Sequence, residues 1–84
     1  MRIERQSRRD KTTIRLIGHF RLEHVDELQK QLEHNGGECV LDLTELTLVD
    51  VDIVRFLGTC EASGVALVNC SPYIREWMNR EQKV

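Results

Sequence analysis

Apolar side chains recur along the chain at two spacings, one typical of strands and one typical of helices. A strand is predicted over residues 12–20, where every second position from Ile14 is apolar or glycine, so Ile14, Leu16, Gly18 and Phe20 share one face. Gly18 lacks a side chain and therefore indicates a bulge or a close backbone approach. Shorter segments predict three more strands, over residues 2–6, 39–43 and 65–68. The run over 39–43 is continuously apolar, which predicts a central strand buried on both faces.

The clearest helical pattern covers residues 22–35. It ends at Asn35-Gly36-Gly37, residue types that tolerate the left-handed backbone of a helix C-terminus. The apolar stripe of this predicted helix consists of Leu22, Val25, Leu28 and Leu32.

A second predicted helix begins at Asp50, a residue type that caps helix starts, and ends at Ser63-Gly64. Its inward face consists of Ile53, Phe56, Leu57 and Cys60, with Val54 on the flank. A third helix is predicted from Pro72, with Ser71 as its cap, to about residue 81. Its inward face consists of Ile74, Trp77 and Met78.

The order strand, strand, helix, strand, helix, strand, helix predicts an α/β fold for residues 1–84, with one mixed sheet of about four strands and about three helices mainly on one face. At 84 residues the chain is expected to form a single small domain with a modest core. Residues 44–49 are too polar and irregular to continue the sheet, so they are expected to form a loop.

Composition and charge limit the kinds of function that can be expected. A net charge of −2 and a pI near 5.9 argue against broad nucleic-acid binding. The first eleven residues are locally basic, but Glu4 and Asp10 dilute this charge, which indicates a solvated edge. No segment has the length of a membrane span or of a signal-peptide apolar region, so a cytoplasmic protein is expected. Three separated cysteines inside apolar stretches, Cys39, Cys60 and Cys70, predict buried free thiols.

The start of the second helix is the candidate functional site. Asp50 and Asp52 gain there from the helix dipole, whereas Val51 is apolar, is not needed for the core and is expected to be exposed. The candidate docking residues are Asp50, Val51, Asp52, Arg55, Gly58 and Thr59. We expect this surface to contact a partner protein.

Four short motifs, in their order and spacing over residues 12–77, resemble the STAS domain of anti-sigma-factor antagonists and sulphate-transporter tails. They are Leu16-Ile17-Gly18, Val40-Leu41-Asp42-Leu43 with its loop to Asp50, Gly64-Val65-Ala66-Leu67, and the small residue before Pro72. The resemblance implies that the start of the second helix and its preceding loop dock a partner such as an anti-sigma factor kinase.

In antagonists of that family an Asp-Ser-Ser/Thr-Gly motif carries the residue that the kinase phosphorylates. In this chain Asp50 matches the aspartate, Val51 stands at the phosphoacceptor, and Asp52 and Ile53 follow. Because valine has no hydroxyl group, the resemblance implies docking without the usual phosphorylation switch. Mimicry of a phosphate by Asp52 is the weaker alternative, since one carboxylate copies a phosphate poorly.

The sequence gives less support to metal binding and to catalysis. Asp50-Val51-Asp52 has the form of a DxD metal motif, but helix capping explains it. His19, His24 and His34 lack zinc-binding spacing with the cysteines, and no acid, base and nucleophile set is recognisable. The expected function is therefore non-catalytic, without cofactor or metal. An accessory subunit of a membrane transport complex and a nucleotide- or lipid-binding domain remain alternatives, and a homodimer remains open.

Overall fold

The computed structural model describes residues 1–33 and 38–82. Its elements follow the chain in the order β1 (Arg2–Arg8), β2 (Lys11–Phe20), a 3-10 turn η1 (Leu22–His24), α1 (Val25–Glu33), β3 (Glu38–Asp42), β4 (Leu46–Val49), α2 (Val51–Ala62), β5 (Ala66–Val68) and α3 (Pro72–Gln82). The predicted end of the first helix at 35–37 lies outside the described residues.

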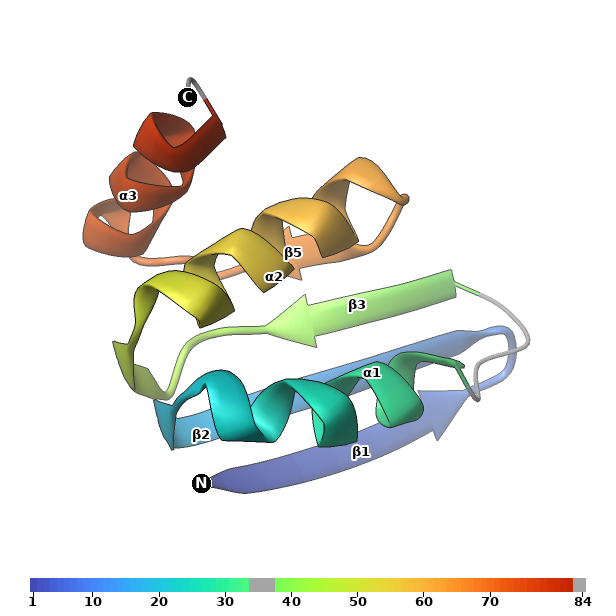
Figure 1. The fold of residues 1–84 in the computed structure, drawn as a ribbon. Helices are drawn as coiled ribbons and strands as arrows, with labels where there is room; N and C mark the ends of the chain where they lie inside the picture. Colours follow the sequence, from blue (N-terminus) through green and yellow to red (C-terminus); the bar gives the residue numbers. More distant parts are fainter. Residues whose placement is uncertain (34–37, 83–84) are drawn as a thin grey trace.

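The strands form one mixed sheet in the order β1-β2-β3-β5, with β4 also paired to β2. β1 is antiparallel to β2, whereas β3, β4 and β5 pair in parallel. The helices lie on one face of the sheet (Figure 1). The predicted α/β class is therefore confirmed. Because the four parallel strands all point the same way, their carboxyl ends meet at one end of the molecule.

β4 corrects the prediction that residues 44–49 form a loop. Leu46 pairs with Gly18 and Leu48 pairs with His19, so Thr47 is an extra residue in β4 and the register shifts there. Gly18 has φ +94° and donates its amide to the carbonyl of Glu45 at 3.0 Å, which confirms the bulge predicted at this glycine. The sheet thus has five strands among the described residues, not about four.

The core lies between the sheet and the helices. β2 contributes Ile14, Leu16 and Phe20, all fully buried, as their alternation predicts. β3 is buried on both faces, with Leu41 toward the core cluster and Val40 on the opposite side. Its central position between β2 and β5 is also as predicted.

α2 packs on both the sheet and α3. Ile53, Leu57 and Cys60 are buried as predicted. Val54, predicted on the flank, is equally buried because α3 packs beside it with Met78. Ser63 ends α2 and Gly64 follows with φ +104°, as the sequence predicts. Burial raises the pKa of the Cys60 thiol to about 11.

The first helix begins later than predicted. Residues 22–24 form a 3-10 turn, and Leu22, predicted in the apolar stripe, is 60% exposed. His24 takes up the inward position: its Nδ1 accepts from the Arg21 amide at 3.0 Å, and its ring meets Phe20 edge-on at 5.6 Å. This local bond fixes the turn, so only Val25, Leu28 and Leu32 of the predicted stripe pack on the core.

Candidate functional site

Asp50 joins two segments at the carboxyl end of the sheet. Its Oδ1 accepts from the Ile53 amide at 3.0 Å, which confirms the predicted cap of α2. Its Oδ2 accepts from the Leu22 amide, also at 3.0 Å, so the same carboxylate fixes the turn after β2. Burial raises the pKa of Asp50, but these hydrogen bonds outweigh burial and hold that pKa below its ordinary value. Asp50 is therefore ionised at neutral pH.

The first turn of α2 is half-buried. Val51, expected to be exposed, keeps only part of its surface in solvent, and Asp52 is similarly half-buried. This corrects the expectation for Val51, because β4 pairs with β2 beside it and shields part of the helix start. Val51 follows the carboxyl end of β4, which pairs with the carboxyl end of β2.

Exposed apolar side chains gather at this end of the molecule. Large apolar residues exposed in the described part of the chain are Met1, Leu22, Leu48, Val68 and Tyr73. Leu22 follows β2, Leu48 and Val68 lie at the ends of β4 and β5, and Tyr73 lies in the first turn of α3. Met1 belongs to the same end because β1 is antiparallel to β2. We call these five residues the carboxyl-end apolar set.

The later half of the predicted docking surface faces α3. Arg55 Nε lies 2.8 Å from Glu81 Oε1, although the Arg55 side chain remains exposed. Gly58 and Thr59 line a groove that α3 closes with Glu81 and Gln82. The six predicted residues therefore divide into a helix start, with Asp50, Val51 and Asp52, and a groove wall, with Arg55, Gly58 and Thr59.

Asp42 is a polar residue of this end that sequence reasoning did not single out. Its Oδ1 accepts from Thr44 Oγ1 at 2.6 Å and from Asn69 Nδ2 at 3.3 Å, which joins the ends of β3 and β5. The hydrogen bond from Thr44 is the largest cause of its lowered pKa. An aspartate followed two residues later by threonine is the sequence signal of such a turn. All of these bonds are internal, so Asp42 positions the loop before β4.

The DxD and zinc alternatives can be compared with the positions of the described side chains. Both oxygens of Asp50 accept from backbone amides, so Asp50 caps the helix as the sequence predicts. Within residues 1–33 and 38–82, no three His, Cys, Asp or Glu side chains converge as a metal site would require. His34, part of the zinc hypothesis, lies outside these ranges. No described helix has the length and apolar character needed to cross a membrane.

Comparison with known proteins gives one informative result. The sequence matches no protein-family model and no curated protein. The structure is similar to that of the anti-sigma factor antagonist SpoIIAA in its unphosphorylated form, with a TM-score of 0.70 and 19% sequence identity. The match covers 93% of this chain and 82% of that chain. The chain therefore has a STAS-like fold, the fold of the anti-sigma factor antagonist SpoIIAA.

Proposed function

We propose that this chain is a non-catalytic protein-interaction module that resembles an anti-sigma-factor antagonist in action. It binds a partner protein, such as an anti-sigma factor kinase, through the β4–α2 loop and the start of α2. The docking residues are those of the helix start, Asp50, Val51 and Asp52, and those of the groove wall, Arg55, Gly58 and Thr59. The setting is bacterial regulation by partner switching in the cytoplasm.

The observation that carries this proposal is the carboxyl-end apolar set. Exposed apolar residues scattered over a surface are normal, but a gathering at one end of a small domain is typical of a protein interface. The Leu22 amide donates to Asp50 and Leu48 precedes Asp50 by two residues, and 60% and 59% of their surfaces are exposed. Burial of such side chains against a partner removes apolar area from water and favours binding.

The proposed binding does not depend on phosphorylation at position 51. Valine offers no hydroxyl group, and residues 50–58 contain no serine, threonine or tyrosine. The first hydroxyl in α2 is that of Thr59, which donates to the Arg55 carbonyl at 3.0 Å. A phosphate at the helix start would add charge beside Asp50 and Asp52 and disrupt an apolar contact. Val51 thus keeps the chain in a permanently binding form.

Affinity capture with three matched baits tests the proposal. Wild type, Val51→Glu and Gln29→Glu on the outer side of α1 are compared, each shown to be folded by circular dichroism. We expect one partner in stoichiometric amount with wild type and Gln29→Glu, and a loss of more than about tenfold with Val51→Glu. Equal capture by all three, or a co-purifying small ligand without a protein partner, would contradict docking at the helix start.

A further inference from the structure

Charge is unevenly distributed along the chain. Residues 1–15 contain six arginine or lysine residues and two acidic residues, whereas residues 16–84 contain six against twelve. The small net charge of −2 therefore hides a basic β1–β2 hairpin on an acidic body. The hairpin tip, Arg8 to Lys11, lies at the amino end of β2. It is separated from the α2 start by the ten residues of β2, or roughly 30 Å.

On the face of the β1–β2 hairpin that the helices do not cover, some cations form ion pairs with carboxylates and others do not. Near the carboxyl end, Arg15 lies 3.5 Å from Asp42 and 3.9 Å from Glu4, and Arg2 lies 2.9 Å from Glu4. Arg8 and Lys11 form the last pair of the hairpin on the same face. In the described part of the chain neither has an ion pair or a hydrogen bond from its side chain. These two adjacent cations at the tip thus have no ion pair, although Asp10 lies in the loop between them.

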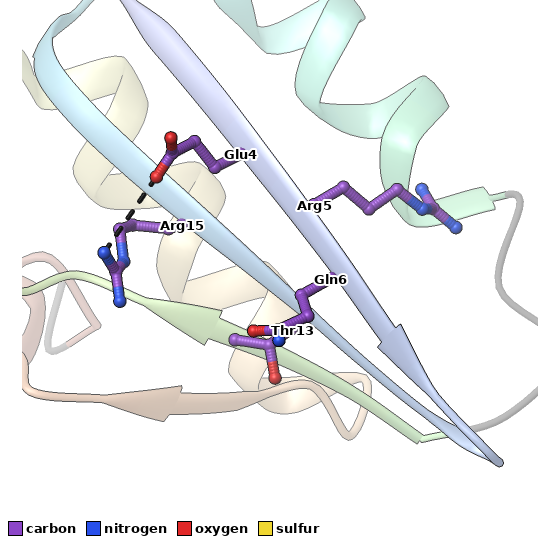
Figure 2. A pocket seen from close by; sticks show the side chains of 5 residues that line it. All are labelled: Glu4, Arg5, Gln6, Thr13 and Arg15. Atoms are coloured by element: carbon purple, nitrogen blue, oxygen red, sulfur yellow. Dashed lines mark ion pairs between the residues drawn. The ribbon is translucent and has the colours of Figure 1, made fainter.

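A hollow of 140 Å³ lies between these two cations and two neutral side chains. Its walls are Gln6, Arg8, Lys11 and Thr13, and no carboxylate lines it. Figure 2 shows Gln6 and Thr13 close together on this face, whereas Arg5 points away from them. A guanidinium, an ammonium, an amide and a hydroxyl group all offer hydrogen-bond donors to one small space. This set complements an oxyanion, which only accepts.

The hairpin turn provides a second, independent observation. The pairing of Arg8 with Lys11 leaves Arg9 and Asp10 as a two-residue loop, and Arg9 has φ +52°. Glycine is the residue that such a position favours, and a left-handed arginine is strained. Arg9 therefore occupies the turn at a cost in stability. Strain of this kind concentrates at functional positions.

We propose that the hairpin tip binds one phosphate group, free or as a phosphate monoester. Arg8 and Lys11 supply the two charges that match a phosphate dianion, and Gln6 and Thr13 donate to its remaining oxygens. With Arg9 and Asp10 in the loop, the four residues 8–11 carry a net charge of +2. An extended polyanion such as a nucleic acid does not fit, because the acidic body would repel it beyond the tip. This site is separate from the proposed docking surface and does not depend on it.

NMR titration of the ¹⁵N-labelled chain with inorganic phosphate at pH 7.5 and low ionic strength tests the site. We expect saturable shifts at the amides of Gln6 and Thr13, with a dissociation constant in the millimolar range. Arg8→Gln and Lys11→Gln should each weaken binding by about fivefold, whereas Arg80→Gln, the same charge change on α3, should leave it unaltered. Equal shifts with chloride at matched ionic strength, or equal weakening by Arg80→Gln, would overturn the proposal.

Two further measurements sharpen the result. Methyl phosphate should bind like phosphate, and dimethyl phosphate should bind at least fivefold more weakly; equal binding of the diester would overturn the assignment to a monoester. Arg9→Gly should raise the melting temperature by a few degrees, because it relieves the turn, and should weaken phosphate binding about twofold. Unchanged binding in this variant would remove Arg9 from the site.

Discussion

At the scale of single residues, Asp50 links the fold to the candidate site. One carboxylate caps α2 through Ile53 and fixes the turn after β2 through Leu22. The cap could be predicted, since aspartate before a helical pattern is a local signal. The bond to Leu22 could not, because its partner is 28 positions away in the sequence. Asp50 therefore positions both Leu22 and the start of α2 at the proposed docking surface.

Substitution of Asp50 separates its two roles. Asp50→Ala removes both acceptors and should lower the free energy of unfolding by about 2 kcal/mol. Asp50→Asn keeps one acceptor for the cap but places an NH₂ group toward the Leu22 amide, so about 1 kcal/mol should be lost. Urea unfolding of the three proteins measures these differences. Equal stability of Asp50→Asn and wild type would show that the bond to Leu22 contributes nothing.

The stabilising effect of Asp50 should depend on pH. Since the pKa of Asp50 is lowered in the folded state, its stabilising effect is complete above the unfolded pKa of about 3.9. The effect is lost as the pH falls through the folded pKa. The difference between wild type and Asp50→Ala should stay constant from about pH 8 to pH 5 and shrink below about pH 4. A difference that grows with acidification would contradict this assignment.

At the scale of elements, the sequence predicted those with strong periodic patterns. α2 and β2 follow their predicted faces because each buries one regular side of the chain. β4 was missed because it has four residues, and the extra Thr47 in its pairing breaks the alternation. The start of α1 was misplaced because a hydrogen bond to the His24 ring replaced the expected helical turn. The β2–β4 pairing is a long-range contact, and the bond to the His24 ring is a local one made by a side chain, so the spacing of apolar residues reports neither.

Gly58 lies in the groove wall between α2 and α3. A Cβ there would lie 3.3 Å from Gln82 Nε2, the far end of a flexible side chain that can move away. Alanine is also the better helix former, so Gly58→Ala should raise the free energy of unfolding by about 0.5–1 kcal/mol. Thermal unfolding measures this change. A destabilised variant would mean that Gln82 is held in place and that the groove between α2 and α3 is rigid.

At the scale of the whole molecule, the two ends differ in the kind of contact they offer. The carboxyl end carries the exposed apolar set, and the hairpin tip carries unpaired cations. Net charge and mean composition could not have predicted this separation, since opposite charges cancel in the total. The parallel pairing of β2, β3, β4 and β5, together with the antiparallel β1, brings these apolar residues to one end.

The position of the exposed apolar residues also determines how two copies of the chain would associate. If no partner covers the carboxyl-end apolar set, we expect copies of the chain to associate weakly through it, because apolar burial favours contact and the net charge of −2 opposes it little. Sedimentation equilibrium should give an average mass that rises above 9.8 kDa with concentration. The double variant Leu22→Ser/Leu48→Ser should remain at the monomer mass, whereas Arg8→Gln should behave like wild type.

Salt distinguishes this contact from a charge-driven one. Association through apolar side chains should persist or strengthen from about 50 mM to about 500 mM sodium chloride, because salt does not weaken apolar burial but screens surface charges. A head-to-tail contact between the basic hairpin of one copy and the acidic body of the next would weaken over the same range. Loss of association at high salt, together with association of the double serine variant, would place the interface at the hairpin and leave the carboxyl end free for a different protein.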